Sequence, residues 1–454
     1  MTVPTNASAP GPVVAGHEGH LKRALGLPSL VLFGMVYIVP LTVFTTYGIV
    51  TQMSGGRLPV AYVVTLVAMF FTALSYARMS VAFPVAGSAY TYSQKTFGAP
   101  LGFLTGWSLL LDYLFLPMLN YLVIGIYLEA AFPAVPAWVF IVASIVIVTV
   151  LNIIGIVSVA RANFLIIAVQ TIFIVTFLAM TIAKLSGTGN VSLAAPFQGD
   201  GTAPGMTPIL AGAAVLCLSF LGFDAVSTLS EEAKDPTRNV PRAIILATVV
   251  SGFVFVVLSY LSQLVFPSNN FSDVDAGSLD VMHTAGGEFL GTFFTAAYVA
   301  GALGSALTSQ ASVARVLFAM GRDRILPRPF FGHVSPKYST PVYAIVLVSL
   351  VSLLAVVIDL ATLASIVSFG ALVAFSAVNL SVIKHYFMDQ GERDVLRNVV
   401  LPLIGFVLTV WLWFSLSGLT LKVGLAWLAA GFVWLLVVTR GFRRPTPVMD
   451  IEPE

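Results

Sequence analysis

Residues 208–230 read PILAGAAVLCLSFLGFDAVSTLS, an apolar stretch that contains a single acid, Asp224. A helix that crosses a bilayer needs roughly 20 apolar residues, so the stretch is long enough to span a membrane. Gly222, two positions before the acid, weakens a helix interior by about 1 kcal/mol. Unpaired backbone groups at membrane depth are tolerated only where they line a cavity. The stretch therefore predicts a broken membrane helix with Asp224 beside a cavity.

The rest of the chain is similarly apolar. Of its 454 residues, 58% are hydrophobic and 9% are charged, whereas a soluble domain carries about 25% charged residues. Because backbone groups in lipid must be paired within the segment, such stretches are helices. We predict an all-α polytopic membrane protein with twelve transmembrane helices, at residues 28–50, 59–80, 102–128, 137–157, 161–184, 208–230, 242–266, 289–314, 341–358, 361–386, 399–418 and 421–439.

The first predicted helix has an interruption that matches the one in the sixth. It contains the sequence Val39-Pro40-Leu41-Thr42, and proline removes a backbone donor and clashes with the preceding turn. Two interruptions five helices apart are the pattern of an inverted five-plus-five repeat, with the binding site between the two breaks.

The basic residues predict the orientation of the chain. Lysine and arginine are enriched in cytoplasmic loops. If the N-terminus is cytoplasmic, 19 of the 22 lysines and arginines lie inside, and only Arg57, Lys184 and Lys422 lie outside. We therefore expect both termini in the cytoplasm.

Two acids remain at membrane depth when the loop charges are set aside: Asp112 in the third helix and Asp224 in the sixth. An ionisable group there is costly and marks a candidate functional site. No lysine, arginine or histidine lies deep in a span to neutralise either acid. Each carboxyl group is therefore either neutral and hydrogen-bonded to a neighbouring helix, or it binds a cation that comes from outside the chain.

Several functional classes lack support. A membrane-embedded enzyme needs a nucleophile with a base, or metal ligands, at membrane depth, and the chain has one cysteine and no deeply placed histidine. It has no phosphate-binding loop for ATP and no repeated charged or carbonyl motif typical of a channel filter. The predicted tails are too short for a signalling domain, and a net charge of +2 gives no indication of nucleic-acid binding. We expect a transporter with no enzymatic activity, cofactor or resident metal.

Three motifs carry a resemblance to a known family. They read FPVAGSAYTYSQKTFGAPLGFLTGW at 83–107, FLGFDAVSTLSEEAKDPTRNVPRAI at 220–244 and ASVARVLFAMGRDRILP at 311–327. With these motifs the chain resembles the amino acid–polyamine–organocation transporter superfamily from about residue 21 to residue 444. The stretches LLDYLFLP at 110–117 and FGALVAFSAVNLSV at 369–382 resemble the bacterial putrescine importers within that superfamily.

The resemblance implies a LeuT-like fold in a bacterial cytoplasmic membrane: two inverted five-helix repeats followed by two helices. It implies alternating access around a site formed by the first, third, sixth, eighth and tenth helices. The expected parts are a cytoplasmic tail, the first repeat, the second repeat, the last two helices and a second cytoplasmic tail, at residues 1–24, 25–186, 187–388, 389–440 and 441–454.

Two departures from related amino acid carriers bear on the substrate. Those carriers have a glycine-rich first break whose N–H groups hold a carboxylate, but residues 37–44 here read YIVPLTVF. Several relatives also carry a lysine in the fifth helix, at the position that corresponds to Gln170. Asp224 therefore has no counter-ion, and we expect a small cationic substrate, putrescine or a related polyamine. A permease for a cationic or other amino acid is the alternative.

The candidate substrate-binding residues are the two acids, nearby aromatic residues and residues of the two breaks: Asp224, Asp112, Tyr113, Phe223, Gly222, Tyr37, Pro40 and Thr42. Aromatic faces would attract the ammonium groups, although packing or an interfacial belt is the alternative role for them. Each buried methylene contributes about 0.8 kcal/mol, so the length of a diamine can be selected.

Hydroxyl groups recur on the eighth helix, at Ser305, Thr308, Ser309 and Ser312. Such hydroxyls form a sodium site in some relatives, but small residues also allow helices to pack closely, and we favour packing. We therefore expect a coupling proton or the membrane potential to drive uptake. The potential alone favours entry by about 2.3 kcal/mol per charge per 100 mV.

Overall fold

The computed structural model describes residues 25–85, 88–155, 159–189, 191–322 and 324–447. The predicted tail at 1–24 and the last seven residues of the predicted tail at 441–454 lie outside the described residues. Within these ranges the regular structure is helical, and two chain segments pair only at one isolated bridge, between Leu25 and Ala233. The all-helical fold predicted from composition and hydropathy is confirmed.

The first half of the chain contains the following helices: α1 (Leu27–Ile38), η1 (Pro40–Phe44), α2 (Tyr47–Met53), α3 (Leu58–Ala82), α4 (Ser88–Phe97), α5 (Ala99–Ala131), α6 (Ala137–Ile154) and α7 (Val159–Ser186). The second half contains α8 (Ala195–Gln198), α9 (Thr207–Leu216), η2 (Cys217–Phe220), η3 (Asp224–Leu229), α10 (Pro236–Val265), α11 (Ser278–Arg322), α12 (Arg328–Phe331), α13 (Val342–Ser352), η4 (Leu353–Val356), α14 (Leu360–Val382), η5 (Ile383–Asp389), η6 (Leu396–Val400), α15 (Leu401–Phe414) and α16 (Gly418–Val438).

Eleven of the twelve predicted spans correspond to helices that are long and apolar enough to cross a membrane within the described part of the chain. The ninth differs, because the apolar helix there covers only Val342–Val356. That is shorter than the roughly 20 residues that a bilayer requires. The structure also adds α4, a largely buried helix that hydropathy did not indicate because its sequence, SAYTYSQKTF, is mixed in polarity.

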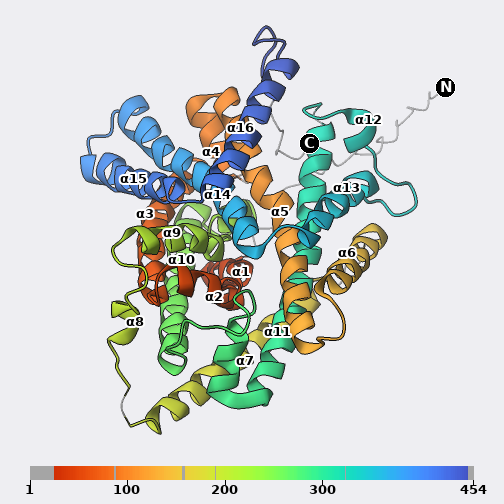
Figure 1. Cartoon of the computed structure of the whole chain (residues 1–454). Helices are drawn as coiled ribbons and strands as arrows, with labels where there is room; N and C mark the ends of the chain where they lie inside the picture. The colour runs from red at the N-terminus through yellow and green to blue at the C-terminus, as the bar shows by residue number, and fades with distance from the viewer. Residues whose placement is uncertain (1–24, 86–87, 156–158, 190, 323, 448–454) are drawn as a thin grey trace, which may run out of the picture.

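The long helices form pairs around a central region of broken segments. Helix α3 packs against α10, and α5 packs against α11. The short segments α1, α2 and α9 lie between these pairs at the centre of Figure 1. The core of the molecule thus surrounds two interrupted helices rather than continuous ones.

The start of α1 is attached to the segment that follows η3. Leu25 donates a backbone hydrogen bond to Glu232 at 3.0 Å, and its carbonyl accepts one from the Lys234 N–H at 2.8 Å. The two interrupted helices are therefore connected at one end of the molecule as well as at its centre.

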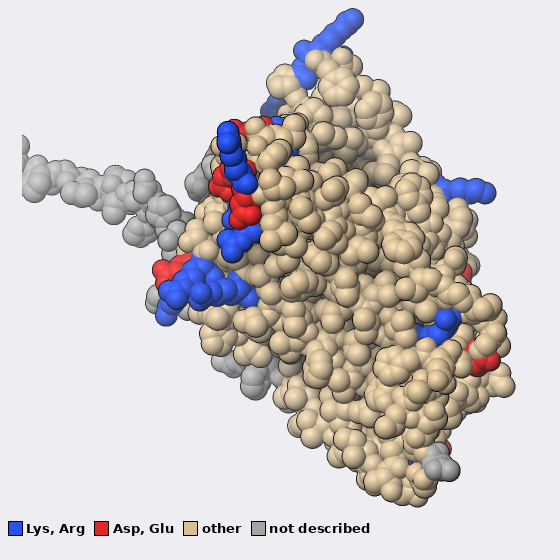
Figure 2. All heavy atoms as spheres, turned by 90° about the vertical axis from the view of Figure 1, so that its left-hand side faces the viewer, with Lys and Arg blue, Asp and Glu red and all other residues tan. Residues whose placement is uncertain are grey.

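Charged residues are unevenly distributed over the surface. In Figure 2 most of the lysine and arginine spheres lie in the upper half of the visible face, above a broad surface with almost no charge. In Figure 1, α4 and α12, which carry Lys95 and Arg328, lie at that upper end, whereas α8 and the C-terminal end of α7 lie lower. This separation agrees with the charge asymmetry of the sequence.

Candidate functional site

The first break begins where α1 ends at Ile38. Val39 has φ +52°, outside the helical region, and Pro40 then starts a short 3₁₀ turn. The hydroxyl of Thr42 donates to the Ile38 carbonyl at 2.9 Å. This bond satisfies a carbonyl that the end of a helix leaves without a partner. The predicted interruption at residues 39–42 is confirmed.

The second break separates α9 and η2 from η3. Leu221 is extended and Gly222 has φ +123°, a conformation that side chains with a Cβ rarely adopt. Asp224 then opens η3, and its Oδ1 accepts a hydrogen bond from the Gly222 N–H at 3.2 Å. The predicted interruption before Asp224 is also confirmed, and its glycine is required by the backbone.

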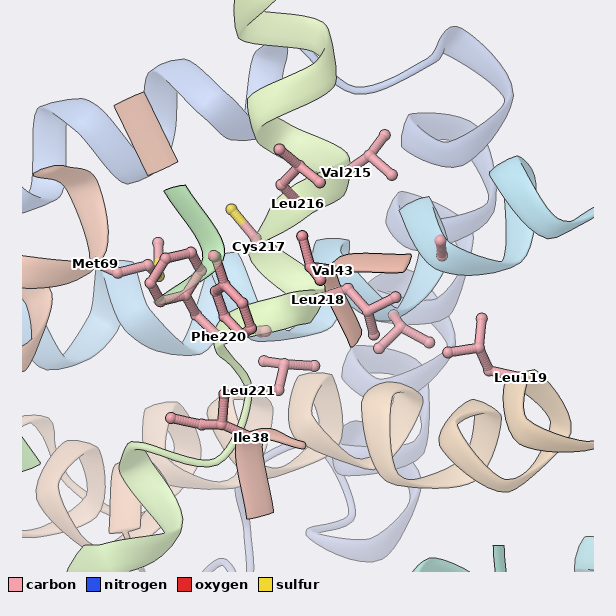
Figure 3. Close-up of a cluster of buried hydrophobic side chains, with 14 of the residues drawn as sticks. Ile38, Val43, Met69, Leu119, Val215, Leu216, Cys217, Leu218, Phe220 and Leu221 are labelled. Carbon is pink, nitrogen blue, oxygen red and sulfur yellow. The ribbon is translucent and has the colours of Figure 1, made fainter. Parts of the chain in front are cut away.

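The two breaks lie directly against each other. A Cβ atom built on Gly222 would lie 2.6 Å from Tyr37 Cδ1 and 3.0 Å from the backbone nitrogen of Ile38. Figure 3 shows the side chains of Leu218 and Leu221, from the second break, beside those of Ile38 and Val43, from the first. This contact joins the midpoints of the two interrupted helices, as the inverted-repeat pattern requires. The symmetry between the two repeats stays a prediction.

Both predicted acids are buried near this contact. Asp112 is 6% exposed and Asp224 is 8% exposed. They are close enough to interact electrostatically with each other and with the phenol of Tyr37. Neither forms an ion pair with a lysine or arginine among the described residues. One Asp112 oxygen, Oδ1, is buried without a hydrogen-bond partner there.

Four aromatic rings pack together near Asp224. Phe223 contacts Phe375 with ring centroids 5.1 Å apart and Tyr76 with centroids 5.5 Å apart. Tyr76 in turn contacts Tyr92 at 6.0 Å. The hydroxyls of both tyrosines are buried and make no hydrogen bond of normal geometry to the described residues. We call Tyr76, Tyr92, Phe223 and Phe375 the aromatic wall.

Sequence reasoning identified Phe223 but missed the other three members of the aromatic wall. They come from α3, α4 and α14, which are distant from one another in sequence. The chain has 14 tyrosines and 33 phenylalanines, and no local pattern distinguishes the ones at the site.

A cavity of about 450 Å³ adjoins the two breaks. Three of the predicted residues line it: Tyr37, Thr42 and Tyr113. The other five, Asp112, Asp224, Gly222, Phe223 and Pro40, do not line it. The acids therefore lie outside the lining of the cavity, whereas Tyr37 and Tyr113, which are close enough to interact electrostatically with both acids, are part of it.

Among the residues that the structure describes, the lining of the cavity has polar groups but no charged side chain. Asn120 donates to the Ser305 hydroxyl at 3.1 Å, and Gln170 also faces the cavity. The recurring hydroxyls on α11 all line it: Ser305, Thr308, Ser309 and Ser312. Thr308 and Ser309 donate to carbonyls of their own helix. Close packing occurs instead at Gly301, where a Cβ would collide with the Gln170 amide.

One end of the cavity is closed by aromatic residues. The lining extends along α11 from Tyr298 to Val316, and at the Tyr298 end lie the buried rings of Phe44, Tyr127 and Phe294. The Phe44 carbonyl accepts hydrogen bonds from the Tyr127 hydroxyl at 2.9 Å and from the Ser278 hydroxyl at 2.6 Å. The lining also includes Thr228 of η3, which is exposed, and on α11 it ends at Val316, next to Arg315. The cavity therefore reaches the surface beside η3.

Comparisons with known proteins agree with this architecture. A family profile described as "Amino acid permease" matches residues 29–430. The low-affinity putrescine importer PlaP of Escherichia coli (strain K12) is 40% identical over 438 residues, which cover 94% of this chain and 96% of that protein. The branched-chain amino acid permease BcaP of Bacillus subtilis is 29% identical, with 93% and 94% of the two chains covered. A methylthioribose transporter of the same species is 28% identical, with 92% and 94% covered.

Proposed function

This chain belongs to the amino acid permease family of membrane transporters, and from that premise we propose that it imports putrescine or a closely related polyamine across a bacterial cytoplasmic membrane. The 40% identity to a putrescine importer over almost the full length of both proteins supports this substrate. The observation that carries the proposal is the pair of buried acids, Asp112 and Asp224, which have no basic partner among the described residues.

A diamine fits this pair of acids. Putrescine carries two ammonium groups joined by four methylenes, so Asp224 binds one ammonium and Asp112 binds the other. The unpartnered Oδ1 of Asp112 offers an acceptor whose burial is costly unless it is paired. The aromatic wall and Tyr113 contact the methylenes, and the aromatic faces attract the charges.

A carboxylate would be poorly held at the same place. In the first break, the N–H groups of Val39 and Thr42 already donate to Val36 and Val39, and Pro40 has none. These are the groups that would bind the carboxylate of an amino acid at a half-helix terminus. The first break therefore favours a substrate without a carboxylate, and a permease for cationic or other amino acids is the less supported alternative.

The cavity serves as the route between the acids and the cytoplasm. We place both termini and the arginine-bearing end of α11 in the cytoplasm, since basic residues are enriched there. The open end of the cavity then faces inward, and the aromatic cluster at Phe44 closes the outer side. Uptake is driven by a coupling proton or by the membrane potential, which favours entry of a doubly charged substrate by about 4.6 kcal/mol per 100 mV.

The test is uptake of labelled putrescine by proteoliposomes that contain the purified full-length chain. We expect Asp224→Asn to abolish uptake while the protein inserts normally. Glu288→Gln is the control, because that carboxylate side chain is 91% exposed, and it should transport like the wild type. Competition with unlabelled lysine, arginine and ornithine separates the two substrate classes. Normal uptake by Asp224→Asn, or stronger competition by an amino acid than by putrescine, would refute the proposal.

A further inference from the structure

A second cavity lies where the end of α11 and the start of α12 meet α16. Its volume is about 470 Å³, and its lining has two arginines, one tryptophan and four other apolar residues: Arg324, Arg328, Trp434, Ile325, Leu326, Pro327 and Val438. We call it the arginine groove. None of its residues belongs to the first cavity.

The backbone of the arginine groove is held in place from both sides. The indole N–H of Trp434 donates to the Ile325 carbonyl at 2.9 Å, which fixes the loop to α16. Ile325 is buried, and its N–H and that of Leu326 both donate to the Met320 carbonyl at the end of α11. Arg324 has φ +60°, a conformation that a non-glycine residue keeps only when its surroundings impose it. The two arginines therefore project from a rigid loop.

The two guanidinium groups of the groove have no acid to neutralise them among the described residues. Arg324 and Arg328 are both exposed, and neither forms an ion pair or a side-chain hydrogen bond there. The two arginines are four positions apart in the sequence, with Pro327 between them. A guanidinium offers a planar set of donors that matches the oxygens of a phosphate group.

The floor of the groove is apolar and continues onto the surface of α16. Val438 and Trp434 lie in the groove, and on the same helix Val433 is 58% exposed and Val437 is 61% exposed. Helix α16 is a candidate membrane span, of which only 17% of the apolar window is buried inside the protein. Its outer face therefore contacts lipid chains.

We propose that the arginine groove binds an anionic phospholipid, with the phosphate between Arg324 and Arg328 and an acyl chain along α16. The charge of the head group and the apolar floor together favour a lipid over a soluble anion. Basic pockets between helices at the cytoplasmic side of a membrane are suited to such head groups. The proposal rests on the membrane orientation given under the proposed function, but it does not depend on the transported substrate.

The test measures lipid binding to the purified full-length protein by native mass spectrometry. The protein in neutral detergent is titrated with phosphatidylglycerol or with phosphatidylcholine of the same acyl chains. We compare the wild type with the double variant Arg324→Gln/Arg328→Gln. Each cation near an anionic surface contributes about 1 kcal/mol, so we expect the double variant to lose about 30-fold in affinity for phosphatidylglycerol, with little change for phosphatidylcholine.

The matched control is Arg238→Gln/Arg242→Gln. These arginines are also exposed, four residues apart and on the same predicted side of the membrane, but they line neither cavity. The control should bind phosphatidylglycerol like the wild type. An equal loss in both double variants would refute a specific site, and so would unchanged binding after Arg324 and Arg328 are replaced. Displacement of the lipid by millimolar inorganic phosphate would overturn the lipid assignment in favour of a soluble anion.

Discussion

Replacing Gly222 by alanine tests whether the two breaks must touch. The new Cβ would lie 2.6 Å from Tyr37 Cδ1, 3.0 Å from the Ile38 nitrogen and 3.1 Å from the Tyr37 carbonyl carbon. Real Cβ atoms do not approach other atoms at the first of these distances, and two of the three neighbours are backbone atoms that cannot rotate away. The substitution must therefore push the breaks apart.

Two costs add to give the expected size of the effect. Alanine at φ +123° stores about 1–3 kcal/mol of backbone strain, and overpacking a buried contact costs about 1–3 kcal/mol. The expected destabilisation is thus about 2–6 kcal/mol. For a chain of this size, 1 kcal/mol lowers the unfolding temperature by about 1–2 °C, so Gly222→Ala should lower it by roughly 2–12 °C.

The unfolding temperature can be measured with a thiol-reactive fluorogenic dye. Cys217 is the only cysteine of the chain and is fully buried, so the dye reacts with it only when the protein unfolds. Alanine substitutions at two other glycines serve as controls that distinguish the effect of the steric clash from the effect of backbone strain. Gly201 has φ +80° with no atom near its Cβ position, and Gly418 has open space without that strained angle. Gly201→Ala should lower the unfolding temperature slightly, and Gly418→Ala should leave it unchanged. If Gly222→Ala unfolds at the temperature of Gly418→Ala, the two breaks are not in the contact described.

Three further substitutions probe the site and its surroundings. Asp112→Asn should raise the KM for putrescine uptake about 10-fold, because one of two charge pairs is lost; an unchanged KM would give Asp112 a packing role. Gln170→Lys should weaken uptake about 30-fold, because the lysine would place a positive charge at the cavity; two like charges about 8 Å apart repel by about 2 kcal/mol at an effective dielectric constant of 20. Gln170→Met is the control, and an equal loss there would rule out the charge as the cause. Burial raises the pKa of Asp275, in the loop before α11, and repulsion from Asp273 and Asp359 adds to the shift. Its charged form therefore destabilises the fold above the raised pKa, so Asp275→Asn should increase the unfolding temperature at pH 7, and this gain should disappear below about pH 4.

The sequence predicted the architecture well because the forces that determine it are local. Helices in lipid must pair their own backbone groups, so apolar length alone located eleven candidate spans within the described residues. The two breaks followed from Pro40 and Gly222, since each acts on its own backbone whatever lies nearby. Helix α4 was not predicted, because its sequence is mixed in polarity. The ninth helix was predicted at residues 341–358, but the apolar helix there is shorter and covers only Val342–Val356.

The site was predicted less completely because its geometry depends on contacts between distant segments. The two acids could be identified from their cost in a membrane, and the structure places both near the contact between the breaks. The aromatic wall could not be identified, since Tyr76, Tyr92 and Phe375 meet only through the packing of α3, α4 and α14. Nor could the sequence indicate that the open cavity lies beside the acids rather than around them.

The pairing of Leu25 with the segment before α10 has a mechanical consequence. An outward swing of α1 by itself would break two backbone hydrogen bonds, at a cost of about 1 kcal/mol each. Helix α10 starts at Pro236, only two residues beyond Lys234, so we expect α1 and α10 to move together. The distance between spin labels on their first turns should stay constant while the transporter cycles.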